Sequence, residues 1–223
     1  VCDPLTEAAA RNDLGQWRVK IVAALKSGNG LSVNAGSFQE AGASAAQELA
    51  FGLAALADQL DAATEAGITV GDALSQIEVR TSIGSNYFLE IAKIRAWRVL
   101  CYAVCKSFGA ADARPTLHAT TTRATQTVYD PNVNMLRATT QAMSAAVAGV
   151  DSITVLPFDG ASKLPDDFSL RIARNAQLLL REEAYLDKVA DPLGGSYYVE
   201  RLTADLADRA WALFLKIENE GGF

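Results

Sequence analysis

Hydrophobic residues follow two alternating spacings along the chain. A long Ala-rich stretch places Leu49, Leu53, Leu56 and Leu60 at helical spacing, which predicts a helix that Gly67 ends. Short runs rich in β-branched residues predict strands at 31–34, 77–81, 115–120, 152–156 and 188–190. Residues 1–2 resemble the end of a sixth strand. Strands that alternate with long helices indicate βα units on a parallel sheet.

The other helical stretches carry their own start signals. A long helix is predicted from Ser85, with an apolar stripe that Arg98 interrupts, so this charge must find a partner or the surface. Asp130 and Pro131 are typical of an N-cap followed by the first helical position. Further helices are predicted at 70–74, around 168–179 and around 206–217.

These elements favour an α/β fold of the (β/α)8 TIM-barrel type. A complete barrel has eight strands in about 250 residues, so we expect residues 1–223 to form one partial barrel domain with the C-terminal five or six βα units. No Gly-rich dinucleotide fingerprint follows a predicted strand, which leaves a Rossmann fold little support. Both ends look cut from a longer chain. The open sheet edges predict a larger polypeptide, self-association or pairing with another chain.

Composition argues against several partners. A formal net charge of −6 disfavours nucleic acid, which is bound through clustered Lys and Arg. No apolar run approaches the roughly 20 residues of a membrane helix. The three cysteines make no disulfide framework, and Cys101 and Cys105, one helical turn apart, are expected to be buried thiols rather than metal ligands. The cytoplasm is therefore the expected compartment.

Five motifs occur in the order in which a known family has them. They are SFQEAGA at 37–43, NYFLEIAK at 86–93, DP at 130–131 with NMLR at 134–137, RIARNAQ at 171–177, and KVADPLGGSYYVE at 188–200. Over almost its whole length the chain resembles the substrate barrel of methylmalonyl-CoA mutases. The segments 129–131 and 155–159 resemble the versions found in the small subunit of heterodimeric members.

The resemblance implies a link to adenosylcobalamin-dependent interconversion of methylmalonyl-CoA and succinyl-CoA. In this family a separate domain binds cobalamin through an Asp-x-His-x-x-Gly motif, and that motif is absent here. We therefore expect adenosylcobalamin in the holoenzyme, no cobalamin-binding domain in this chain, and no cofactor bound by this chain alone.

Positions that are catalytic in the family carry other residues here. Gly36 and Ser37 stand where the resemblance places a Tyr and a His that hold the radical intermediate and the thioester carbonyl. Neither replacement offers an equivalent acid or hydrogen-bond donor. Thr120 and Asp151 replace glutamines, and Thr154 replaces a histidine. All of these departures are expected at the C-terminal ends of strands, where barrel active sites lie.

The residues that would contact coenzyme A have also changed. The resemblance places Gln76 at the position of an Arg and Glu78 at that of a Ser, so a cation is lost and a repelling charge is gained. Arg80 is displaced but can still contact an anion, and Asn29 is a further candidate. No metal site is expected.

Several residues have both a structural and a functional interpretation. His118, the single histidine, is expected to be hydrogen-bonded within the fold rather than catalytic. The turn around Gly194 and Gly195 suits a phosphate nest or a simple chain reversal equally well. Gln39 and Glu40 are expected to begin a helix, where they cap it or contact neighbouring loops.

Two main hypotheses for the function remain. The first is a structural, non-catalytic partner that docks against the large catalytic subunit of a mutase. The second is a catalytically competent acyl-CoA mutase with altered residues. An unrelated carboxylate hydrolase on a barrel has little motivation, because Glu182 and Glu183 are adjacent on a helix and point apart.

Overall fold

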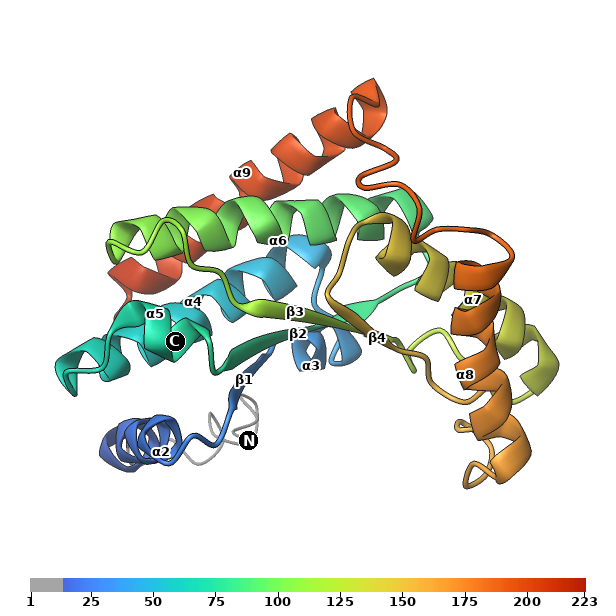
Figure 1. Cartoon of the computed structure of the whole chain (residues 1–223), viewed down its shortest axis with the longest axis horizontal. Helices are drawn as coiled ribbons and strands as arrows, with labels where there is room; N and C mark the ends of the chain where they lie inside the picture. The colour runs from blue at the N-terminus through green and yellow to red at the C-terminus, as the bar shows by residue number, and fades with distance from the viewer. Residues whose placement is uncertain (1–13) are drawn as a thin grey trace.

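The computed structural model describes residues 14–223, which form a parallel four-stranded sheet with helices between the strands (Figure 1). The strands are β1 (Leu31–Asn34), β2 (Ile77–Ile83), β3 (Thr116–Thr121) and β4 (Ser152–Thr154), and they lie side by side in chain order. The predicted α/β class and parallel arrangement are confirmed. Closure into a barrel is not seen, because β1 and β4 each have one neighbouring strand among the described residues.

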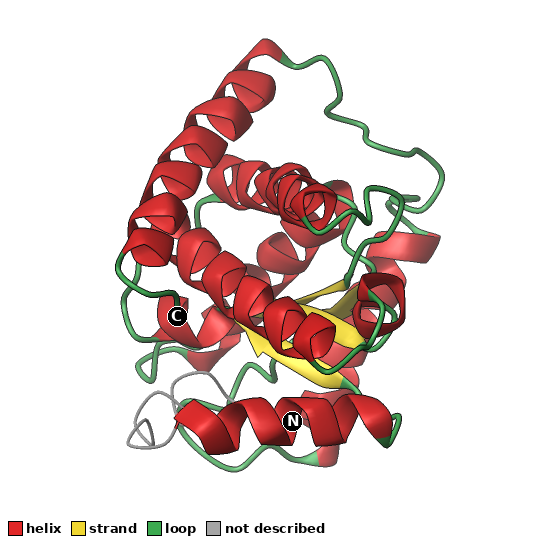
Figure 2. Ribbon diagram, turned by 90° about the vertical axis from the view of Figure 1, so that its left-hand side faces the viewer, coloured by secondary structure: helices red, strands yellow, loops and turns green. Residues whose placement is uncertain are grey.

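The helices connect the strands and add an outer layer. They are α2 (Leu14–Lys26), α3 (Gly36–Glu40), α4 (Ala45–Glu65), α5 (Val70–Leu74), α6 (Tyr87–Ser107), α7 (Pro131–Val147), α8 (Asp167–Glu182) and α9 (Tyr197–Asn219). Helices α4, α6, α7 and α8 pack against one another in chain order. Helix α9 lies outside them, against α4 and α6 (Figure 2).

Side-chain caps explain where the long helices begin. Ser44 and Gln47 form a reciprocal capping box at the start of α4, and the side chains of Asn86 and Asp130 accept a backbone hydrogen bond at α6 and α7. Each cap satisfies a backbone N–H that has no partner inside the helix. Pro131 occupies the first turn of α7, where its missing N–H costs nothing.

The sheet has one apolar and one polar face. Ile77, Val79, Leu117 and Ala119 are buried in the main core with α4 and α6. Alternate residues point the other way, and the strand register aligns Asn34, Arg80, His118 and Ser152 in one row across the four strands. Arg80, Thr116, Ser152 and Thr154 are exposed, so the described helices leave much of this polar face uncovered.

Two strand predictions were wrong or shortened. Residues 188–190 form no strand: Tyr185 and Asp191, with φ of 53° and 46°, turn the chain on both sides, and Val189 is 60% exposed. Strand β4 ends at Thr154, so Val155 and Leu156 continue without pairing. The predicted strand end at residues 1–2 lies outside the described residues.

Candidate functional site

The C-terminal ends of β1 and β2 meet at Gly36, the first residue of α3. A Cβ atom on Gly36 would lie 2.8 Å from both the backbone nitrogen and the Oγ of Ser82. The Ser82 hydroxyl also donates to the Gly36 carbonyl, at 3.2 Å. The backbone of this position is therefore closed against β2, and it has no room for a tyrosine side chain.

The short length of β1 leaves the backbone of Ser82 without a strand partner. The carbonyl of Gln76 accepts from Leu31 on the β1 side, whereas that of Ile83 accepts from Thr122 on the β3 side. Alternate residues of β2 therefore face β1, and Ser82 is one of them. Strand β1 ends at Asn34, opposite Arg80, so it leaves the backbone groups of Ser82 without a strand partner.

Charged side chains take the place of that missing strand. The Glu48 carboxylate accepts from the Ser82 N–H at 3.1 Å and from the Thr81 hydroxyl at 2.5 Å. The Lys93 ammonium donates to the Ser82 carbonyl at 2.5 Å. Both backbone groups of Ser82 are thus satisfied inside the protein, as buried peptide groups require.

Lys93 is also the centre of a buried ionic cluster. Its Nζ lies 2.7 Å from Glu48 Oε2 and 2.6 Å from Glu90 Oε2, and the side chains of Lys93 and Glu48 are fully buried. Burial raises the pKa of Glu48, and its bonds to Lys93 and Thr81 offset only part of that effect. Burial by itself lowers the pKa of Lys93, but the two carboxylates raise it above its ordinary value. This cluster was not predicted from the sequence, because Glu48 and Glu90 lie in the first turns of α4 and α6, where an acidic residue is an ordinary feature of a helix start.

Besides Gly36, three of the replaced catalytic positions lie near strand C-terminal ends. The Ser37 hydroxyl donates to the Asn34 carbonyl at 2.7 Å, so it is used within its own turn. Thr120 lies between Ser82 and Thr154 in the strand register. The Thr154 hydroxyl lies 3.1 Å from His118 Nε2. These side chains are neutral, and the bonds of Ser37 and Thr154 remain within the fold.

The expectation that every departure lies at a C-terminal strand end was wrong. Asp151 precedes β4, at the N-terminal end of the sheet, and Gln76 and Glu78 lie at the beginning of β2. The Asp151 carboxylate accepts from the Leu117 N–H at 2.7 Å and from Arg98 at 2.9 Å. Asp151 is thus the partner that Arg98 needed because of its place in an apolar stripe. Partial burial raises the pKa of Asp151, but the hydrogen bonds from Leu117 and Arg98 outweigh it and lower the pKa below its ordinary value.

The four coenzyme A candidates do not converge. The Asn29 amide donates to Ser27, and the Gln76 amide donates to the Asp72 carbonyl. The Arg80 guanidinium lies 2.6 Å from Glu78, so its charge is compensated within β2.

His118 is hydrogen-bonded within the polar face of the sheet. Its Nδ1 lies 2.6 Å from Ser152 Oγ and its Nε2 lies 3.1 Å from Thr154 Oγ1. Partial burial lowers the pKa of His118, with Arg80 adding to that effect and Glu78 opposing it. Both ring nitrogens have partners, as the structural interpretation predicted.

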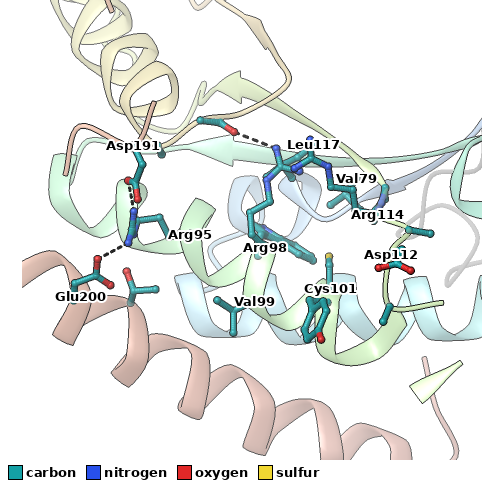
Figure 3. Close-up of a pocket in the computed structure, with 18 residues that line it drawn as sticks. Val79, Arg95, Arg98, Val99, Cys101, Asp112, Arg114, Leu117, Asp191 and Glu200 are labelled. Atoms are coloured by element: carbon teal, nitrogen blue, oxygen red, sulfur yellow. Dashed lines mark hydrogen bonds and ion pairs between the residues drawn. The ribbon is translucent and has the colours of Figure 1, made fainter. Parts of the chain in front are cut away.

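The Gly194–Gly195 turn is a chain reversal and offers no free anion nest. The N–H groups of Gly194 and Ser196 donate to carbonyls of the same turn, and that of Gly195 donates to the Glu200 carboxylate. Figure 3 shows Arg95 between Asp191 and Glu200. These two ion pairs hold the turn against α6, at one end of a cavity of about 580 Å³. All three N–H groups are used internally.

The other predicted contacts have mixed outcomes. Gln39 and Glu40 end α3 instead of beginning a helix, but they do contact neighbouring elements: Gln39 donates to Glu90, and Glu40 accepts from Thr122 and Arg123. Cys101 and Cys105 are buried free thiols, as predicted. Within residues 14–223 the structure has no helix with the length and apolarity needed to cross a membrane.

The parallel four-stranded sheet with connecting helices places the described residues in the class of parallel α/β domains. Comparison with known proteins identifies the family. The family model described as methylmalonyl-CoA mutase matches residues 10–223, and the chain belongs to this family. The resemblance predicted from the five motifs is confirmed.

Several curated relatives carry the name of the small subunit. The chain is 51% identical over 197 residues to "Methylmalonyl-CoA mutase small subunit" of Porphyromonas gingivalis, a match covering 86% of this chain and 32% of the relative. It is 47% identical over 193 residues to the small subunit of Streptomyces virginiae, covering 86% and 31%. It is 42% identical to "Methylmalonyl-CoA mutase" of Rhizobium meliloti, covering 87% and 28%. The chain spans about a third of the length of these relatives.

Proposed function

We propose that this chain is part of the small, non-catalytic subunit of an adenosylcobalamin-dependent methylmalonyl-CoA mutase, and that it serves as a scaffold for a catalytic large subunit. The observation that carries the proposal is the closed backbone at Gly36. Catalytic members have a tyrosine at this position. In this chain, a Cβ atom added to Gly36 would lie 2.8 Å from two atoms of Ser82. The loss of the side chain is therefore built into the packing.

We propose that residues 1–223 belong to one partial TIM-barrel domain, of which the structure describes residues 14–223. A parallel sheet in chain order, with apolar residues toward the helices and a row of polar residues on the other face, supports this geometry. Among residues 14–223, β1 and β4 each have one edge without a partner strand, and further strands of the same polypeptide would pair there. Until they pair, these edges favour self-association.

The replaced positions Gly36, Ser37, Thr120, Asp151 and Thr154 are proposed to be non-catalytic. When bound, adenosylcobalamin supplies the radical chemistry of the family. The residues described here do not fit a cobalamin site, because both ring nitrogens of His118 are already bonded to hydroxyl groups. We therefore assign cofactor binding to other parts of the holoenzyme. The two buried free thiols suit a reducing cytoplasm.

The test uses the full-length small and large subunits, separately and together. Turnover of methylmalonyl-CoA with adenosylcobalamin is expected only where the large subunit is present. Titration calorimetry of the full-length small subunit with methylmalonyl-CoA is expected to show no micromolar binding. Micromolar binding together with turnover by the small subunit alone would favour the altered enzyme and contradict the scaffold.

Two substitutions sharpen this test. Thr120→Ala and Thr154→Ala in the small subunit are expected to leave turnover by the assembled pair unchanged, because neither hydroxyl takes part in the reaction. In an altered enzyme they would lower kcat. Intact assembly of each variant, checked by size-exclusion chromatography, serves as the control.

A further inference from the structure

The cavity drawn in Figure 3 lies at the N-terminal end of the sheet, away from Gly36. Its lining comes from α6, from the segments that precede β3 and β4, and from the turn before α9 together with the start of that helix. Its volume of about 580 Å³ is typical of small-molecule sites, which measure about 300–1,000 Å³. Figure 3 shows Asp191 and Glu200 at one end, with Arg98 and Arg114 further along the wall.

The end of the cavity at Arg95 has an excess of negative charge. The Arg95 guanidinium pairs with two carboxylates, those of Asp191 and Glu200. One cation and two anions leave a net charge of −1 there. Arg95 and the Gly195 N–H both donate to Oε1 of Glu200, and this side chain is 46% exposed, so its Oε2 is available to a ligand.

The other end of the cavity has an excess of positive charge. The Asp151 carboxylate accepts from Arg98 at 2.9 Å. Burial raises the pKa of Asp151, whereas Leu117, Arg98 and Arg114 lower it, so both cations act on this one carboxylate. Arg114 is exposed, and within residues 14–223 its side chain makes no hydrogen bond and no ion pair, not even with Asp112 on the same wall. Two cations that share one anion leave a net charge of +1.

We infer that this cavity binds a small zwitterion, a molecule with one ammonium and one carboxylate group on a short carbon chain. The ammonium group lies at the negative end and the carboxylate at the positive end. Val99 and Tyr102, which are 55% and 51% exposed, supply apolar surface for the carbon chain. Arg95 and Arg98 are three residues apart on α6, a rise of about 4.5 Å, which suits a chain of a few carbon atoms.

The two opposite charge excesses favour a zwitterion over a singly charged ligand. A bound ligand removes water from the charged groups at both ends, and this cost is offset only where the ligand supplies the opposite charge. A simple carboxylate leaves the negative end unmatched, and a simple amine leaves the positive end unmatched. The cavity is on the outer side of the domain, so failure of this inference would leave the proposed function untouched.

Protection of Arg114 from phenylglyoxal tests the inference in the full-length small subunit assembled with its large subunit. Peptide mass spectrometry measures the modification at Arg114 itself, so probe binding elsewhere in the complex does not interfere. The probe is 6-aminohexanoate, and hexanoate and hexylamine each lack one of its two charges. The zwitterion should half-protect Arg114 at a concentration at least about tenfold below that of either analogue, because each missing charge removes a charged hydrogen bond.

Glu200→Gln locates the ammonium end. The variant loses the negative charge but keeps a carbonyl oxygen that Arg95 can use. It should raise the half-protecting concentration of 6-aminohexanoate about tenfold and leave that of hexanoate unchanged. Asp205→Asn is the matched control, because Asp205 lies on the same helix, pairs with Arg201 and is also 46% exposed. This control should change neither value.

Four results would overturn the inference. They are an Arg114 that phenylglyoxal does not modify in the assembled pair, no protection by 6-aminohexanoate, equal protection by hexanoate and 6-aminohexanoate, and an unchanged value for 6-aminohexanoate in Glu200→Gln. The first would mean that another part of the protein covers the cavity. The third would mean that the cavity takes a simple anion.

Discussion

The closed position at Gly36 allows a sharp stability test by Gly36→Ala. The added Cβ would lie 2.8 Å from the Ser82 nitrogen, whereas ordinary contacts of a Cβ begin at 3.4 Å, so the two strand ends must separate by about 0.6 Å (3.4 − 2.8). Ser82 cannot yield easily, because Glu48 and Lys93 hold both of its backbone groups. Overpacking of this kind typically costs about 1–3 kcal/mol.

The matched control is Gly71→Ala, in α5. A Cβ at Gly71 would meet no atom within 4 Å, so alanine there should be neutral or stabilising by about 0.4–1 kcal/mol through its smaller loss of backbone entropy. Both variants are measured by urea unfolding of the full-length small subunit. If Gly36→Ala is as stable as Gly71→Ala, the position is not closed. In that case the double variant Gly36→Tyr with Ser37→His should be tested for thioester binding. Our proposal predicts that it binds none.

Three further predictions follow from individual contacts. Lys93→Met leaves two buried carboxylates without a cation, so the free energy of unfolding of the full-length subunit should fall by about 3–5 kcal/mol in urea unfolding. A decrease below about 1 kcal/mol would mean that Lys93 carries little charge. Arg95→Ala releases the turn around Gly195 and should speed limited proteolysis there, with only about 1 kcal/mol of stability lost, because its partners are largely exposed; unchanged cleavage would show that other contacts hold the turn. The lowered pKa of His118 means that the folded state resists its protonation, so stability should fall as the pH drops below 6.5, and His118→Gln should remove that dependence in thermal unfolding.

The sequence predicted the elements whose signals are local. Strand β1 and helix α5 have the predicted bounds, since apolar β-branched runs and the Thr69 cap act within a few residues. The segment 188–190 has a similar apolar pattern, but a strand needs a partner, and the turns at Tyr185 and Asp191 direct the chain elsewhere.

The site was less predictable because it depends on contacts between distant residues. The motif comparison identified Gly36 as a lost tyrosine, but the approach of Ser82 is a contact between distant residues. The partners of Lys93 come from 45 residues away on α4 as well as from its own helix. Such pairings between distant residues have no signature in a single sequence. The replaced side chains, by contrast, could be identified from the sequence motifs alone.

The position of α9 has a consequence for how the protein folds during synthesis. Ala207, Ala210 and Phe214 belong to the same core cluster as residues of α4 and α6, and the Arg95–Glu200 bond spans 105 positions of sequence. The outer surfaces of two long apolar helices therefore stay uncovered on the ribosome until the residues of α9 have been made. Contacts of such separation form late and slowly, so these helix surfaces are expected to be the last part of the core to be covered.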